Sequence, residues 1–197
     1  MISISLSNLI LILLVIILGF IIVFTLMYWK IAGYKKLAFS DNLGVFNYRE
    51  LGKQLALIKK DKSIKAFSFL LLDIDNFKAC NDNFGYDKAD ILLQEFVNYL
   101  KAIIRKTDLF FRYKNGDEFV IIIKNISPKE VKEIADRLRE AIYNKKFVMG
   151  DKELQLSISI GIKNSKNDES IESLRYYAEK ALFEAKKNKN SLVVSNE

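Results

Sequence analysis

Near the middle of the chain the sequence reads Arg112-Tyr113-Lys114-Asn115-Gly116-Asp117-Glu118-Phe119. Apolar runs stand on both sides of the central Asn-Gly pair, at residues 109–113 and 119–123. This arrangement is a strong hairpin signal, because Asn and Gly both tolerate positive φ. The sequence therefore predicts two paired strands with the carboxylates of Asp117 and Glu118 at their turn. Such carboxylates suit a metal bound to phosphate, although charged turn residues are more often only solvated.

A second informative stretch is Phe67-Ser68-Phe69-Leu70-Leu71-Leu72, an apolar run that ends abruptly in Asp73-Ile74-Asp75. It predicts a buried central strand with carboxylates at its C-terminal end. If this strand neighbours the hairpin, Asp73 converges with Asp117 and Glu118, and three carboxylates repel one another unless a cation lies between them. Their hard oxygen atoms favour Mg²⁺ or Mn²⁺. The alternative is that Asp73 and Asp75 only cap the helix that follows.

Composition excludes some classes of site. The chain has 197 residues, of which 50% are hydrophobic, so it can bury a full core. It has one cysteine, Cys80, and no histidine, which leaves neither an internal disulfide nor a zinc constellation to propose and points to a reducing compartment. The net charge of +7 favours anionic partners, which could be nucleotides, nucleic acid or an acidic membrane face.

The N-terminal segment predicts one membrane span. No charged residue occurs from Leu9 to Tyr28, and the run is long enough to cross a bilayer as a helix. We expect residues 1–8 to form a short extracytoplasmic tail with no sensor domain, residues 9–29 a transmembrane helix, and residues 30–40 a juxtamembrane linker. Trp29 and the lysines at positions 30, 35 and 36 follow the run, which predicts a single-pass protein of the inner (cytoplasmic) membrane with its bulk in the cytoplasm.

The rest of the chain alternates helical and strand patterns. Helices are expected over residues 77–84, over residues 87–105 with Ile91 in the apolar stripe, and after a capping box at Ser127. A second hairpin is expected around a turn at residues 150–152, with its alternating strand ending near Gly161, and residues 192–194 are expected to be an edge strand. The predicted class is α+β, an α/β sandwich with a mixed, mainly antiparallel sheet and flanking helices.

Several stretches together resemble one family. Residues 73–90 resemble the DxDxFKxxNDxxGHxxGD signature of the GGDEF family, the diguanylate cyclases, and residues 116–119 resemble its signature turn. Residues 157–161 and 178–186 are similar to its later strand and final helix, so the resemblance covers about residues 40–195 and predicts a GGDEF domain over residues 41–197. Several long motifs in the family's order are far more specific than any one of them.

The resemblance implies a palm-like nucleotidyl-cyclase fold that condenses two GTP molecules into cyclic di-GMP. Each site of this family binds one GTP, so catalysis implies a homodimer, and no nucleic-acid partner is expected. By the same match, Asp73, the Ile74 carbonyl and Asp117 hold Mg²⁺ or Mn²⁺ on the triphosphate. Asp117 and Glu118 are the implied catalytic residues, one of which helps to deprotonate the attacking 3′-hydroxyl.

Other positions match residues that contact the nucleotides. Asn81 and Asp90 match the guanine-binding positions, and a carboxylate there prefers the N–H donors of guanine to the bare N1 of adenine. Lys78 and Lys186 match phosphate-side lysines. The implied substrate-binding set is Lys78, Asn81, Tyr86, Asp90, Asn115, Gly116 and Lys186. Arg105 and Asp108 resemble an RxxD inhibitory site for the cyclic dinucleotide product.

The sequence also departs from the family pattern. The signature turn reads Lys-Asn-Gly-Asp-Glu-Phe and is one residue longer than usual, Tyr86 replaces a histidine, and Asn190 stands where the family has a phosphate-binding arginine. Two alternatives to a working enzyme therefore stay open. One is a catalytically degenerate regulatory module that binds cyclic di-GMP or GTP, and the other is a membrane-bound dimerisation element.

Overall fold

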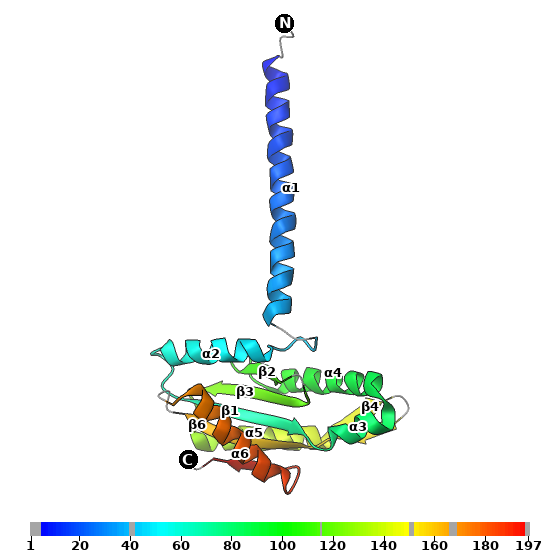
Figure 1. The fold of residues 1–197 in the computed structure, drawn as a ribbon, viewed down its shortest axis with the longest axis vertical. Coiled ribbons are helices and arrows are strands. Elements are labelled where there is room, and N and C mark those ends of the chain that lie inside the picture. The colour runs from blue at the N-terminus through cyan, green and yellow to red at the C-terminus, as the bar shows by residue number, and fades with distance from the viewer. Residues whose placement is uncertain (1–4, 40–41, 115, 150–151, 166–168, 196–197) are drawn as a thin grey trace. The chain divides into compact units, whose positions relative to one another are not determined.

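The structure is a computed structural model that describes residues 5–39, 42–114, 116–149, 152–165 and 169–195 (Figure 1). The chain divides into two compact units, Met1–Phe39 and Ser40–Glu197. The finer boundaries expected within the first forty residues stay predictions.

The described part of the first unit is a single helix. The helix α1 (Leu6–Phe39) has 34 residues. Its stretch Ile12–Lys30 is long and apolar enough to cross a membrane, and among the described residues it is the one helix that meets this test. The helix continues through residues 31–39, where the sequence predicted a linker.

The second unit is built on β1 (Phe67–Ile74), the middle strand of a five-stranded sheet with the order β2-β3-β1-β6-β7. Both neighbours of β1, β3 (Glu118–Lys124) and β6 (Ile158–Ser165), run antiparallel to it. The strand β2 (Leu109–Tyr113) pairs antiparallel with β3, and β7 (Leu192–Val194) pairs parallel with β6 at the edge. The predicted mixed, mainly antiparallel sheet and its C-terminal edge strand are confirmed.

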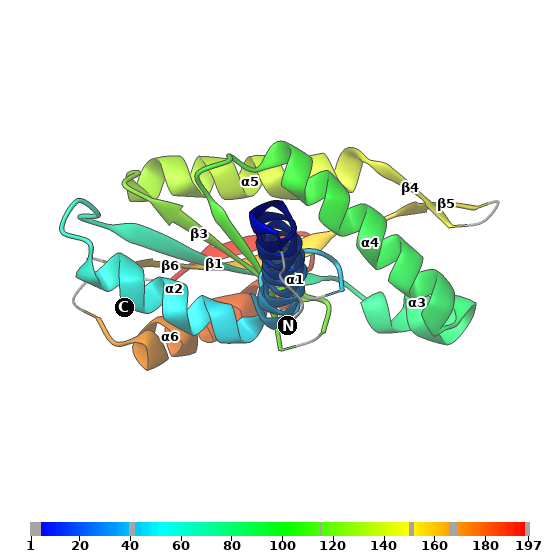
Figure 2. The same ribbon diagram turned by 90° about the horizontal axis from the view of Figure 1, so that it is seen from above.

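Helices cover both faces of this sheet (Figure 2). The helices α2 (Tyr48–Lys60) and α6 (Ile171–Lys186) pack on one face. The opposite face is covered by α4 (Tyr86–Ile103) and α5 (Pro128–Asn144), with the short α3 (Phe77–Phe84) joining β1 to α4. All eight residues of β1 are buried because both of its faces are covered. The predicted α+β sandwich is therefore confirmed.

Capping and turn residues predicted from the sequence explain where these helices begin and end. One residue predicted to be in the core, Ile91, is exposed instead. The capping box of α5 forms as expected, with Ser127 and Glu130 bonded reciprocally. Gly85, with a φ of 82°, allows the chain to turn from α3 into α4. Ile91 was expected in the apolar stripe of α4, but its side chain is 65% exposed, and Leu93 and Val97 are buried instead. The predicted helical period was therefore right, but the buried face of α4 includes Leu93 and Val97 and excludes Ile91.

The second predicted hairpin is shorter than expected. The strands β4 (Lys146–Met149) and β5 (Lys152–Gln155) form a separate two-stranded sheet. The expected turn residues 150 and 151 lie outside the described part. The hairpin stops at Gln155, because the Ser157 carbonyl accepts a hydrogen bond from the backbone N–H of Asp75 at 2.9 Å and β6 then pairs with β1. The predicted strand that ran to Gly161 is therefore two strands.

Gly161 in β6 lies directly against α6. A Cβ at this position would lie far inside van der Waals distance of the backbone oxygen of Ala178 and the backbone nitrogen of Leu182. We expect Gly161→Ala to lower the free energy of unfolding by about 3 kcal/mol or more, because two backbone segments must separate. Urea-induced unfolding of the full chain measures this effect.

Gly52→Ala is the matched control. Nothing lies within 4 Å of the Cβ position of Gly52, which is inside α2. Alanine should stabilise the helix there by about 0.5–1 kcal/mol. Equal effects of the two substitutions would contradict the close contact at Gly161.

Candidate active site

The register of the sheet places two carboxylates side by side. Asp73, near the end of β1, lies opposite Glu118 of β3 on one side and Ser159 of β6 on the other. Residues directly opposite in an antiparallel pair point to the same face, with their Cβ atoms about 4.5–5.5 Å apart. The Ile74 N–H donates to the Asp117 carbonyl at 3.4 Å. The structure thus brings together Asp73, Ile74, Asp117 and Glu118, while Asn115 lies outside the described residues.

One lysine neutralises this cluster in part. Lys186 Nζ, at the end of α6, lies 2.5 Å from Asp73 Oδ2. Burial raises the pKa of Asp73 from 3.8 to about 6, and repulsion by Asp117 and Glu118 adds to this effect against the attraction of Lys186. Burial also raises the pKa of Glu118, while Lys114 and Lys186 lower it and Asp117 and Glu179 raise it further. Burial and mutual repulsion therefore both disfavour the charged forms of these carboxylates.

The donor set fits a metal ion that arrives with phosphates. Among the described residues, no group of three or more acidic, cysteine or histidine side chains is placed to hold a metal by itself. Mg²⁺, however, is usually bound through one or two carboxylates together with substrate phosphates. Asp73 and Glu118 provide neighbouring oxygen donors for such an ion, and burial raises the pKa of both carboxyl groups.

The predicted nucleotide-contacting residues lie on the helices that follow β1. Lys78 and Asn81 are on α3, and Tyr86 and Asp90 are in the first turns of α4. Lys78, Tyr86 and Asp90 are exposed, and Asn81 is half-buried. The structure therefore presents these side chains on the helical layer that starts at the C-terminal end of β1.

Asp75 has a different role from the one considered in the sequence. The N-cap of α3 is Asn76, with a φ of 57° and no side-chain cap, so neither aspartate caps this helix. The Asp75 carboxylate instead accepts hydrogen bonds from Ser157 Oγ at 2.6 Å, Ser159 Oγ at 2.7 Å and the Asn190 N–H at 2.8 Å. Asp75 thus fastens the end of β1 to β6 and to the segment after α6.

Sequence reasoning missed a network between the turn and α6. Glu179 Oε1 accepts hydrogen bonds from Tyr113 Oη at 2.7 Å and from Lys114 Nζ at 2.9 Å. Arg175 Nε donates to Tyr113 Oη at 3.0 Å. Burial acts to raise the pKa of Glu179, but the bonds from Tyr113 and Lys114 and the nearby cations outweigh it and lower the pKa. A buried tyrosine hydroxyl needs a partner, and Tyr113 was the available signal.

The turn that joins β2 to β3 contains the Asn-Gly pair. Four residues, 114–117, connect β2 to β3. Lys114 has a positive φ of 49°, whereas the described glycines with positive φ are Gly44 and Gly85 and not Gly116. Arg112 Nε donates to the Gly116 carbonyl at 2.9 Å and holds the turn in place. The predicted hairpin is therefore confirmed, and Gly116 does not use the positive φ that it tolerates.

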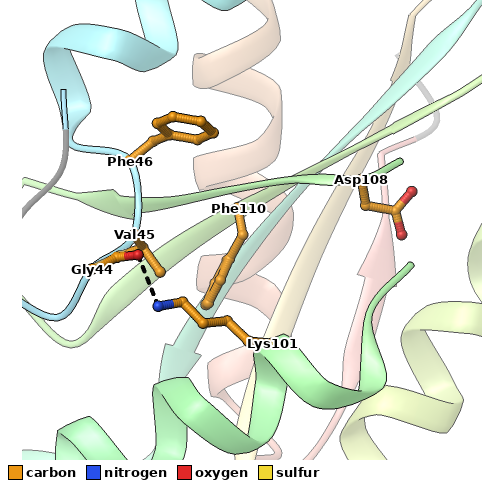
Figure 3. A pocket seen from close by; sticks show the side chains of 6 residues that line it. All are labelled: Gly44, Val45, Phe46, Lys101, Asp108 and Phe110. Atoms are coloured by element: carbon orange, nitrogen blue, oxygen red, sulfur yellow. Dashed lines mark hydrogen bonds between the residues drawn. The ribbon is translucent and has the colours of Figure 1, made fainter. Parts of the chain in front are cut away.

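Arg105 and Asp108 lie apart from these carboxylates. The Arg105 N–H donates to Asp108 Oδ2 at 3.2 Å in the turn before β2. Asp108 lines an open cavity of about 210 Å³, shown in Figure 3, whose other lining residues are Gly44, Val45, Phe46, Lys101 and Phe110. Burial raises the pKa of Asp108, although Arg105 acts against this shift. The five residues of β2 separate Asp108 from the 114–117 turn, a span of about 17 Å.

Sequence comparison places the chain among known proteins. A profile described as "Diguanylate cyclase, GGDEF domain" matches residues 38–191. Diguanylate cyclase A of Treponema denticola is 35% identical over 125 residues, which is 63% of this chain and 33% of that protein. Response regulator PleD of Caulobacter vibrioides is 34% identical over 165 residues, 81% of this chain and 36% of that protein. The chain spans about a third of the length of these relatives.

Comparison with solved structures finds the same fold in GGDEF domains. The crystal structure of the coiled coil and GGDEF domain of DgcB from Caulobacter crescentus, in complex with c-di-GMP, has a TM-score of 0.84 at 18% identity, with 92% of this chain and 98% of that chain covered. The active GGEEF domain of a diguanylate cyclase from Vibrio cholerae has a TM-score of 0.68 at 24% identity, with 77% and 97% covered. At these identities the likeness shows the fold, which is the one predicted.

The pKa of Asp73 makes stability depend on pH. In metal-free buffer with EDTA, we expect the free energy of unfolding to fall as pH rises between about 4 and 7. The native chain keeps the Asp73 proton up to about pH 6, whereas the unfolded chain releases it near 3.8. A native state that binds more protons loses stability as pH rises, here by at most about 3 kcal/mol.

The Asp73→Asn variant isolates this contribution, because it cannot titrate at that position. Urea-induced unfolding of both proteins across the same pH range measures the difference between their profiles. If the two profiles run parallel, the titration does not belong to Asp73.

Proposed function

Because the chain belongs to the GGDEF family of diguanylate cyclases, we propose that it condenses two GTP molecules into cyclic di-GMP in a reaction that depends on Mg²⁺ or Mn²⁺. The observation that carries the proposal is the pairing of Asp73 with Glu118 at the end of β1, with Lys186 beside them. This arrangement concentrates oxygen donors where a positive charge is lacking. A metal nucleotide would supply that charge.

The residues at the strand ends would have two different roles, metal binding and proton transfer. Asp73, the Ile74 carbonyl and Asp117 would hold the metal, which neutralises phosphate charge during in-line transfer when it is bound. In each of two steps the 3′-oxygen of one nucleotide attacks the α-phosphorus of the other, and pyrophosphate leaves. Glu118 would accept the hydroxyl proton, and its raised pKa brings it closer to the operating pH.

The neighbouring elements would bind the nucleotide. Asp90 would accept hydrogen bonds from the N–H donors of guanine, and Asn81 would donate or accept at the guanine edge, with Tyr86 beside them. The exposed positions of Tyr86 and Asp90 leave them accessible. Lys78 and Lys186 would contact phosphates. Gly116, and Asn115 outside the described part, belong to the turn that the phosphates would approach.

Two nucleotides must meet, so we propose that the active form is a homodimer in which each copy binds one GTP. We also propose that α1 anchors the chain in the inner membrane with the cyclase unit in the cytoplasm, because Trp29 and Lys30 follow the apolar stretch on one side only. An anchor raises the local concentration of the copies. Release of the chain from membranes by alkaline washing would contradict the anchor.

The first test of this function is turnover. The full chain, incubated with GTP and Mg²⁺, should produce cyclic di-GMP, and Glu118→Gln should lower the rate by about 100-fold or more, because amide cannot accept the proton. Product formation is measured by chromatography. Glu153→Gln, at an exposed glutamate of β5 paired with Lys146 at 2.6 Å, is the matched control and should keep the wild-type rate. A folded wild-type dimer that makes no product would overturn the enzyme proposal.

A regulatory module is the second candidate, favoured by the cavity beside Asp108. In this reading, Arg105 and Asp108 bind cyclic di-GMP whether or not the chain turns over. Arg105→Ala should weaken cyclic di-GMP binding by about 10-fold or more, because a charged hydrogen-bond donor is lost. Calorimetry measures the affinity, and Lys106→Ala is the control for charge. Equal affinities of wild type and Arg105→Ala would remove the proposed product site.

A further inference from the structure

The turn between β2 and β3 begins with a lysine in an unusual conformation. Lys114 has a φ of 49°, in the left-handed region where a residue with a Cβ is strained. Such residues persist where surrounding contacts hold them, and they cluster at ligand sites. The contacts that hold Lys114 come from its neighbour Tyr113, whose ring centroid lies 4.8 Å from Lys114 Nζ, and from α6.

The partner on α6 is Glu179. Lys114 Nζ lies 2.9 Å from Glu179 Oε1, and the two side chains are 51% and 41% exposed. Ion pairs at this exposure contribute little net stability, since water competes for both charges. The pair can therefore open at low cost when a stronger anion is present.

Lys114 and Lys186 are the two cations that act on Glu118, but they differ in how they are held. The partner of Lys186 is Asp73, whose side chain is 6% exposed, so moving Lys186 would leave a buried carboxylate without its cation. The partner of Lys114 keeps two other contacts. Glu179 would retain the hydrogen bond from Tyr113 and the nearby charge of Arg175. Of these two lysines, Lys114 is therefore the one that can leave its partner at the lower free-energy cost.

We propose that Lys114 binds the polyphosphate tail of the nucleotide, and that its ion pair with Glu179 is the resting position from which it is released. The proposal rests on the nucleotide function proposed above. It assigns a substrate contact to the turn residue that the sequence offered no reason to select. Glu179 acts as a positioning residue, because it holds the ammonium beside the site without contacting the substrate.

The chemistry of the side chain suits this role. A lysine ammonium is a compact charge on a flexible stem, so it can follow a phosphate group over several ångströms. A metal nucleotide placed beside Asp73 and Glu118 brings several phosphate charges close to the turn. Those charges attract Lys114 more strongly than a single half-exposed carboxylate does.

The first test is nucleotide binding measured by calorimetry with Mg²⁺. The probe is the α,β-methylene analogue of GTP, which cannot be cleaved at the reacting bond. Lys114→Gly removes the charge and suits the positive φ, so the variant should fold, and it should bind the analogue about 10-fold more weakly. Its affinity for guanosine should stay at the wild-type value, because guanosine has no phosphate. Lys114→Arg should restore most of the affinity for the analogue.

The second test asks whether the ion pair between Lys114 and Glu179 competes with ligand binding or only stabilises the fold. Glu179→Gln should bind the analogue about 2- to 5-fold more tightly than wild type, because Lys114 no longer has a competing partner. The double variant should match Lys114→Gly, since the gain acts through Lys114. Lys146→Ala, which breaks the exposed pair with Glu153 in β4 and β5, is the matched control and should bind as wild type does.

The outcomes are distinguishable. If wild type does not bind the analogue, the nucleotide function and the role of Lys114 both fall. If wild type binds and Lys114→Gly binds equally well, or loses guanosine affinity in parallel, the role of Lys114 alone is overturned. Weaker binding by Glu179→Gln would overturn the resting position, because it would mean that Glu179 supports the bound state.

Discussion

The site depends on the direct contact of α6 with β6. Gly161 has no side chain, so the backbone of α6 rests on the strand at Ala178 and Leu182. The helix is thereby held close enough to the sheet for its polar residues to reach the neighbouring strands. Lys186 contacts Asp73 at the end of β1, and Glu179 contacts Tyr113 at the end of β2.

This packing explains how three acidic side chains, those of Asp73, Glu118 and Glu179, can lie at one end of a sheet. Arg175, Glu179 and Lys186 come from a single helix face, and they bring two cations and one carboxylate to a group that already contains Asp73 and Glu118. Burial keeps the pKa values of Asp73 and Glu118 raised in spite of these cations. The cations supplied by α6 and the turn offset part of the repulsion among the carboxylates, and the metal nucleotide proposed above would offset more of it.

The sequence predicted elements whose causes are local. The apolar run of β1, the capping box at Ser127 and the edge strand at residues 192–194 each depend on a few neighbouring residues, and each is confirmed. The family resemblance also identified the carboxylates that the register of β1 and β3 places together. Contacts between distant segments could not be predicted in this way. The bond from Asp75 to Ser157 and the network at Glu179 depend on how helices and strands meet in space, which neither periodicity nor turn chemistry encodes.

The longer signature turn shows why the location of an extra residue matters more than its presence. Successive residues of a strand point to opposite faces, so an insertion within β3 would move Glu118 away from Asp73. The observed register keeps Tyr113 opposite Glu118 and Glu118 opposite Asp73. The additional length is therefore confined to residues 114–117, and Asp73 and Glu118 stay on the α6 face. A departure from the family pattern that looks disruptive in the sequence thus preserves the geometry of the acidic pair, and it places a lysine where the pattern has a glycine-rich turn.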